Sequence, residues 1–221
     1  MPLRRVDALL FDLDGTLVDS APDLAAAANA QRRAQGLDEL PFERYRPMVG
    51  SGARGMLGVA FGIRPDDERF PALKADFLQR YAEALLVHTR VFDAMHVVLD
   101  RLAAHALPWG IVTNKALHLA EPIVRALPIR HAATLVGGDS TPHTKPHPAP
   151  LLEAARRLGV TPGRCAYVGD DLRDMQAARA AGMAALAAGW GYLGDAAPID
   201  AWGADAVLSD PNELLHWLGL P

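Results

Sequence analysis

Apolar runs of strand length alternate with amphipathic helical segments along most of the chain. Short apolar runs rich in strand formers predict buried strands, whereas apolar residues at positions i, i+3 and i+4 predict helices. Strict alternation of the two predicts a parallel sheet that helices cover on both faces. The expected strands lie within residues 6–14, 107–114, 132–139, 164–171, 183–189 and 204–210, and the expected helices within 94–106, 116–127, 149–159 and 174–182.

One interval breaks this alternation. Between residues 18 and 89 helical periodicity dominates, and no run reads convincingly as a buried strand. Helices inserted after the first strand would cover the carboxyl ends of the sheet, where ligands bind in such folds. The sequence therefore predicts an α/β fold, with a Rossmann-like parallel sheet core (1–17 and 90–221) and an inserted helical cap (18–89), whose expected helices cover 21–36, 53–62 and 70–88.

Composition and charge narrow the class of protein. The chain has 221 residues, 50% hydrophobic and 22% charged, with a net charge of −4 and no basic cluster, so neither nucleic acid nor an anionic membrane is an expected partner. The first apolar run is interrupted by Asp7, which argues against a signal peptide, and no uncharged apolar stretch reaches the roughly 18 residues of a spanning helix. We expect a cytoplasmic monomer or homodimer, with the single cysteine, Cys165, in the core of a strand.

Two carboxylates close the first expected strand. Asp12 and Asp14 stand two residues apart in "FDLDGTL", on one face of a continuing strand, where their like charges need a cation. Gly15 follows at once and indicates a turn. The pair is therefore a candidate reaction centre.

Polar residues also follow the other expected strands. Thr113 lies in "IVTNK", Lys145 in the proline-rich loop "HTKPHPAP", and Asp170, Asp171 and Asp174 in "GDDLRD". The carboxyl ends of parallel strands lie at one edge of a sheet, so we expect these side chains to converge with the first two aspartates.

Phosphoryl transfer is the reaction that this set of residues favours. Crowded carboxylates suit a hard divalent cation, for which Mg²⁺ is the first choice, and a lysine and a hydroxyl can balance the oxygens of a phosphoryl group. One aspartate can act as nucleophile, and the second can protonate the leaving alcohol and then activate water. A small phosphate ester is therefore the expected substrate.

Four motifs carry a resemblance to a known family. "DLDGTLVDS", "VTNK", "KPHP" and "VGDDLRDMQAARAAG" resemble, in order and over the whole chain, the motif series of the haloacid dehalogenase superfamily phosphatases. "FDLDGTLVDSAPDLAAA" and "KPHPAPLL" are similar to phosphoglycolate phosphatases, whereas "GSGARGML", "FLQRYAEALLVHTRVFDAM" and "WGADAVLSDPNEL" are closer to N-acetylmuramic acid 6-phosphate phosphatases of peptidoglycan recycling. Both substrates carry a carboxylate besides the phosphate.

The resemblance implies a role for each acid. Asp12 would be the nucleophile and a metal ligand, and Asp14 the acid and base, with its backbone carbonyl on Mg²⁺. Asp170 would ligate the metal directly, and Asp174 would act through water or an outer shell of contacts. Asp171 departs from the small hydroxyl residue that is commoner at its position, so its role stays open.

The resemblance also implies how substrate is held. Thr113 and Lys145 would hold the phosphoryl oxygens, with help from the amide of Asn114. Arg54, in the small-residue segment "GSGARG", is the candidate partner for a substrate carboxylate, because a guanidinium can grip a carboxylate with two hydrogen bonds. Weaker candidates for this specificity role are Arg44, Arg46 and Lys115.

Several of these residues also have a purely structural interpretation. Thr113 with Asn114 could cap a helix, and Asp174 could simply favour a helix N-terminus. Ser20 opens "SAPD", a typical capping signal, so a structural role is favoured there. His143 and His147 lie near Lys145, but loop polarity explains them more simply than catalysis.

Other classes of function remain alternatives. A phosphomutase would keep the same residues and differ in the cap, and a dehalogenase would need neither Asp14 nor a metal. A phosphoaspartate receiver module uses a similar residue set, but its acidic pair precedes its phosphoacceptor and it has no helical insertion. A catalytically inactive binding module would not need the intact acids.

Overall fold

The computed structural model describes residues 6–194 and 197–220. Its main element is a six-stranded sheet in the order β5-β4-β1-β6-β7-β8, and every neighbouring pair of strands is parallel. The strands are β1 (Ala8–Phe11), β4 (Trp109–Val112), β5 (Leu135–Val136), β6 (Cys165–Gly169), β7 (Ala184–Ala188) and β8 (Ala206–Leu208). All six expected strands are therefore present, and the predicted fold class is confirmed. Residues 1–5, 195–196 and 221 of the expected core segment lie outside the described residues.

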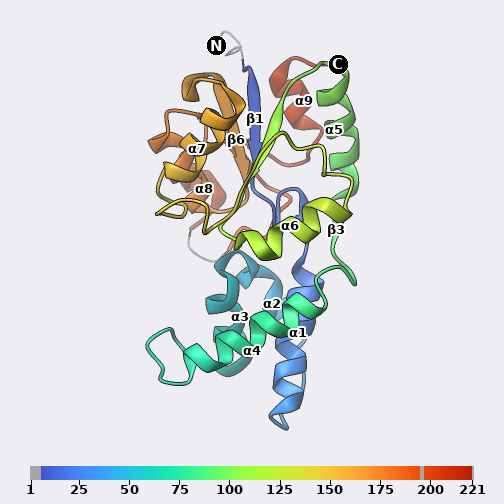
Figure 1. Cartoon of the computed structure of the whole chain (residues 1–221), viewed down its shortest axis with the longest axis vertical. Helices are drawn as coiled ribbons and strands as arrows, with labels where there is room; N and C mark the ends of the chain where they lie inside the picture. Colours follow the sequence, from blue (N-terminus) through green and yellow to red (C-terminus); the bar gives the residue numbers. More distant parts are fainter. Residues whose placement is uncertain (1–5, 195–196, 221) are drawn as a thin grey trace.

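The sheet buries apolar side chains on both of its faces. In the central strand β1, Leu9 and Phe11 enter one apolar cluster, whereas Ala8 and Leu10 enter a second one. This split follows from the strand geometry, because successive side chains point to opposite faces. The first cluster continues into α5 (Asp93–Ala104), α6 (Leu117–Ala126) and α9 (Glu213–Leu218), and the second into α7 (Ala149–Leu158) and α8 (Leu172–Ala180), so the sheet lies between two layers of helices (Figure 1).

A helical cap lies beyond the carboxyl ends of the strands (Figure 1). It comprises α1 (Ala21–Ala34), α2 (Phe42–Tyr45), the 3₁₀ turn η1 (Arg46–Ser51), α3 (Gly52–Phe61) and α4 (Phe70–Glu83). Two short antiparallel strands, β2 (Val18–Asp19) and β3 (Arg90–Val91), pair where the chain enters and leaves it. Cap side chains such as Phe77 and Met56 belong to the same apolar cluster as Phe11, so cap and core share buried contacts.

The helix α4 is shorter than its pattern predicts. It ends at Glu83, five residues before the end of the expected 70–88 segment. The buried carboxylate of Asp23, in the first turn of α1, accepts hydrogen bonds from the backbone of His88 and Thr89 and from the Thr89 hydroxyl. These bonds hold the segment after α4 beside α1, so a contact between distant parts of the chain overrides the local helical pattern.

Several short elements were not predicted. The strands β2 and β3 have only two residues each, and α9 has six, which is too short for a periodic pattern to identify. Cys165 is buried at the start of β6, as expected. None of the helices in the described ranges combines the length and the apolar character needed to cross a bilayer.

Candidate active site

Three carboxylates converge at the carboxyl edge of the sheet. Asp12 follows β1, Asp170 follows β6, and Asp174 lies in the first turn of α8. One carboxylate oxygen from each lies within 4.8 Å of the other two. Three oxygen donors at this spacing form a set that a hard divalent cation prefers. The cluster therefore fits a metal such as Mg²⁺.

Lys145 joins this cluster. Its Nζ atom lies 3.0 Å from Oδ1 of Asp12 and 2.7 Å from Oδ1 of Asp174, and it donates to the Tyr167 hydroxyl at 2.7 Å. The residue is only 3% exposed. Burial alone would lower the pKa of Lys145, but Asp12 and Asp174 raise it above its usual value, so the side chain stays an ammonium.

The same burial acts on the acids. Burial is the main reason that the pKa of Asp12 rises to about 7, with Asp174 and Asp14 adding to the effect and Lys145 opposing it. The pKa of Asp170 rises well above its ordinary value, first because of burial and then because of Asp12 and Asp174. A divalent cation among these groups would offset both burial and mutual repulsion.

Residues that the sequence did not single out hold Asp170 in place. The Thr16 hydroxyl donates to Oδ1 at 3.1 Å, and the Tyr192 backbone N–H donates to Oδ2 at 2.8 Å. Gly15 has a φ of 82°, and a Cβ atom there would lie 2.1 Å from the Asp170 carboxylate; a Cβ at Gly191 would lie 2.2 Å from the Asp170 side chain. Both positions therefore require glycine. Of the residues around Asp170, only Gly15 had been noted in the sequence, as the turn after the first strand.

Asp171 and Asp174 together start α8. Asp171 is the N-cap, its side chain accepts from the Arg173 backbone, and Asp174 Oδ2 accepts from the Asp171 N–H at 3.1 Å, forming a capping box. Asp174 therefore occupies both positions that the sequence left open, a helix N-terminus and the acidic cluster. Asp171 pairs with Arg173 at 2.8 Å, and Arg173 in turn donates to the Gly50 carbonyl of the cap at 2.5 Å. Although burial opposes it, this pairing lowers the pKa of Asp171.

Thr113 and Asn114 organise the loop after β4. Asn114 accepts from the Lys145 backbone N–H and donates to its carbonyl, both at 2.9 Å, so its side-chain amide fixes the loop that carries the lysine. The Thr113 hydroxyl accepts from the Lys115 N–H at 3.1 Å. The helix-cap interpretation of these two residues is wrong, because α6 begins later, with Ala116 as its N-cap.

Asp14 is held by two donors on one oxygen. The Ser20 hydroxyl and Lys115 Nζ both donate to its Oδ1 atom, the latter at 2.5 Å. Ser20 precedes α1 as its N-cap, but its side chain makes no capping bond. Ser20 therefore occupies the predicted N-cap position, but its side chain does not cap the helix, because the hydroxyl donates to Asp14 instead.

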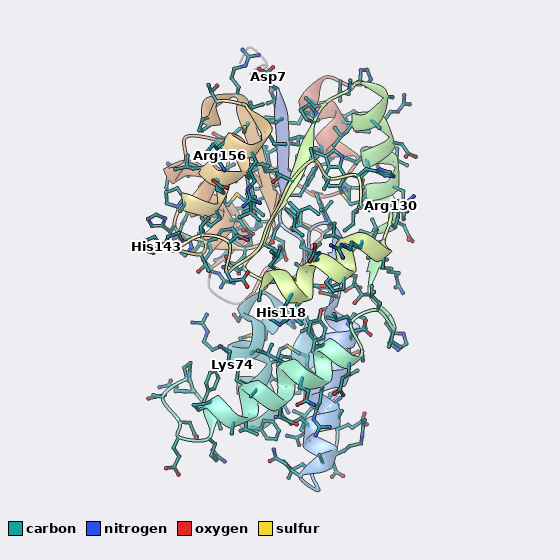
Figure 2. All side chains as sticks on the ribbon, viewed as in Figure 1. Asp7, Lys74, His118, Arg130, His143 and Arg156 are labelled. Carbon is teal, nitrogen blue, oxygen red and sulfur yellow. The ribbon has the colours of Figure 1, made fainter. Side chains whose placement is uncertain are left out.

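A cavity of about 320 Å³ lies between these residues and the cap. From the cap, Phe77, Leu78 and Tyr81 of α4 line it, together with the turn 49–53. Lys74 of α4 and His118 of α6 also line the cavity. Figure 2 labels Lys74 on the cap and His118 where α6 faces the cap. From the core, the lining includes Asp12, Asp14, Thr113, Asn114, Lys115, Lys145, Asp170, Asp171, Arg173 and Asp174.

The structure does not bring Arg54 to this cavity. Within the described ranges, Arg54 lines a separate hollow of about 730 Å³ on the cap, together with Arg32 and Arg44. The reason is the rotation of α3, which begins at Gly52 and turns Ala53 toward the cavity and Arg54 away from it. Arg46 also lies elsewhere, with its guanidinium 5.3 Å from the centre of the Tyr192 ring.

Comparison with known proteins agrees with this arrangement. Residues 9–188 match the model of the haloacid dehalogenase-like hydrolases. The chain is 48% identical over 214 residues to a phosphoglycolate phosphatase of Xanthomonas campestris pv. campestris, with 96% of each chain covered. It is 40% identical over 219 residues to an N-acetylmuramic acid 6-phosphate phosphatase of Pseudomonas aeruginosa, covering 99% of this chain and 97% of that protein.

The fold comparison gives the same result. A predicted phosphoglycolate phosphatase from Haemophilus somnus 129pt is similar over 96% of this chain and 97% of its own, with a TM-score of 0.84 and 30% sequence identity. The resemblance that the sequence motifs indicated is thereby confirmed. The chain belongs to the haloacid dehalogenase-like hydrolases.

Proposed function

We propose that this protein is a Mg²⁺-dependent phosphomonoesterase that works through a phosphorylated Asp12. The observation that carries the proposal is the position of Lys145, whose ammonium lies 3.0 Å from Asp12 and 2.7 Å from Asp174, beside the three-carboxylate cluster. A buried cation next to a candidate nucleophile can stabilise the charge of a phosphoryl group during transfer.

Asp12, Asp170 and Asp174, with the backbone carbonyl of Asp14, would hold the metal. When bound, Mg²⁺ neutralises charge on the carboxylates and on the phosphoryl oxygens. A carboxylate oxygen of Asp12 attacks phosphorus and displaces the alcohol, which takes a proton from Asp14. Asp14 then removes a proton from water, whose oxygen attacks phosphorus and releases phosphate and free Asp12. Thr113 and Lys145, which both line the cavity, bind phosphoryl oxygens.

The part of the substrate that carries no phosphate would face the cap. Lys74 lines the cavity, is exposed, and makes no hydrogen bond or ion pair within the described part of the chain. An unpaired ammonium suits a carboxylate. Phosphoglycolate and N-acetylmuramate 6-phosphate, the substrates in the names of the two relatives, each carry one, so we propose a small carboxylated phosphate ester as substrate.

Competition between these two esters tests the proposal. With Mg²⁺ present, we expect the protein to release inorganic phosphate from at least one of them, and the ratio of kcat/KM values identifies the preferred ester. EDTA should abolish the reaction and added Mg²⁺ should restore it. Activity that persists in EDTA would contradict the metal requirement, and transfer of the phosphoryl group to a second position of the sugar would identify a mutase.

A further inference from the structure

Lys115 has a largely buried, cationic side chain, 7% exposed, for which the proposed reaction has no role. It follows β4, and its Nζ atom donates to Asp14 Oδ1 at 2.5 Å and to the Tyr81 hydroxyl at 2.9 Å. The same nitrogen lies 4.9 Å from the centre of the Tyr81 ring. Asp14 belongs to the core and Tyr81 to helix α4 of the cap, so one ammonium connects the two parts of the molecule.

The backbone of Lys115 is fixed from two sides. The Thr113 hydroxyl accepts from its N–H at 3.1 Å, and its carbonyl accepts from the Gly138 N–H at 2.8 Å. Gly138 is pressed against this loop, because a Cβ atom there would lie 2.2 Å from the Asn114 carbonyl oxygen. The loop that carries Lys115 is therefore fixed, and the contacts of Nζ with Asp14 and Tyr81 then hold the ammonium in place.

The contact with Asp14 leaves one carboxylate oxygen available. Lys115 and Ser20 both donate to Oδ1, whereas Oδ2 accepts no hydrogen bond from any residue that the structure describes. Asp14 lines the cavity. An acid that protonates a leaving alcohol must present one oxygen at a fixed place. Two donors on Oδ1 define the orientation of the carboxyl group and leave Oδ2 for the substrate.

The cap side of the contact is equally rigid. Tyr81 is 1% exposed, and its ring stacks on Phe77 of the same helix, with 6.4 Å between ring centres and 6° between planes. Burial alone would lower the pKa of Lys115, but Asp14, with its hydrogen bond, raises it above its usual value. A buried ammonium needs partners. Tyr81 supplies one of them in the cap position seen here.

From this arrangement we propose that Lys115 is a positioning residue, which holds Asp14 ready for proton transfer when Tyr81 of the cap lies over it. The inference rests on the proposed role of Asp14 as acid and base. It differs from a role in substrate choice, because the contacts of the ammonium go to the acid and to the cap.

Leaving-group dependence tests this inference. An alkyl phosphate without a carboxylate needs its leaving oxygen protonated, whereas p-nitrophenol leaves as a stable anion. Because kcat/KM reports steps up to release of the alcohol, we expect Lys115→Met to lower kcat/KM about 100-fold for the alkyl ester and less than about fivefold for p-nitrophenyl phosphate. Lys115→Arg should recover part of the loss, and Tyr81→Phe should produce a smaller loss of the same kind.

His118→Gln is the control, since His118 lines the same cavity without contacting Asp14 and has no role in the proposed reaction. It should show no dependence on the leaving group. Equal losses of Lys115→Met on both esters, in a variant whose circular dichroism is unchanged, would overturn the role of Lys115. Failure of the wild-type protein to release phosphate from these two esters and from phosphoglycolate and N-acetylmuramate 6-phosphate would instead overturn the proposed function, so the two failures are distinguishable.

Discussion

The core wall of the cavity and the part of the cap wall around Lys74 differ in how firmly their side chains are held. On the core wall, Lys145 is 3% and Asp174 1% exposed, and each makes at least two polar contacts. On the cap wall, Lys74 is exposed and, among the residues described, without a polar partner, and its neighbours Phe77 and Leu78 are apolar. Groups that react need preorganisation, whereas groups that select a substrate can change without disturbing the reaction.

The core wall gains its order from contacts between segments far apart in sequence. Lys145 reaches Asp12 and Asp174, and Thr16 and Tyr192 both donate to Asp170. Replacing Lys145 would leave the carboxylates of Asp12 and Asp174 without their cation, which is strongly destabilising. The cap wall carries no comparable network around Lys74, so we expect substitutions there to change KM and little else.

The largest expected effect is the loss of metal binding from the core wall. Asp170→Asn removes a negative charge and a ligand from the cluster, so we expect Mg²⁺ affinity to fall at least about 100-fold. Titration calorimetry on protein freed of metal with EDTA measures this directly, independently of activity.

The neighbouring acid provides the control. Asp171 caps α8 and pairs with Arg173, and it does not belong to the three-carboxylate cluster. Asparagine is also a good N-cap, so Asp171→Asn should keep the helix and the Mg²⁺ affinity. Equal losses in the two variants would mean that the metal is held by overall negative charge, and the contrast between the two walls would weaken.

The smallest effect is expected on the cap wall. Because an exposed ion pair contributes at most about 1 kcal/mol, Lys74→Ala should raise KM about fivefold for a carboxylated ester. It should leave KM for p-nitrophenyl phosphate nearly unchanged. Steady-state kinetics on both esters measures the difference.

Arg54→Ala tests whether Arg54, as the sequence predicts, or Lys74, as the structure indicates, binds the substrate carboxylate. The motif "GSGARG" predicts that Arg54 binds the carboxylate, whereas the structure places it in the other hollow of the cap. We therefore expect Arg54→Ala to have no selective effect on the carboxylated ester. A selective rise in KM for Arg54→Ala and not for Lys74→Ala would restore the original prediction.

Sequence patterns predicted the core wall well because its residues follow recognisable strands. Asp12, Thr113 and Asp170 each follow an apolar run, and parallel strands must bring such positions to one edge. The same patterns could not show which way a residue on a short cap helix points, because one residue changes the direction by about 100° on a helix. Ala53 and Arg54 differ by that step.

The sequence predicted that the strand ends converge, but it could not predict the individual hydrogen bonds that side chains make across long separations. Lys115 is 101 residues from Asp14, and Tyr192 is 172 from Ser20. Neither pair belongs to a pattern of neighbouring positions, so Lys115 was at most a weak candidate for specificity. The contact of the Ser20 hydroxyl was missed for a different reason, since the capping signal identifies the N-cap position but not the acid, six residues away, to which the hydroxyl donates.

Trapping the phosphorylated protein tests the central claim most directly. Asp14→Asn removes the group that we propose activates water, while p-nitrophenyl phosphate still supplies a leaving group that needs no acid. After mixing with Mg²⁺ and this ester, acid quenching and peptide mass spectrometry should find one phosphoryl group on Asp12. Release of p-nitrophenol with the phosphoryl group on another residue, or with none on the protein, would contradict the account.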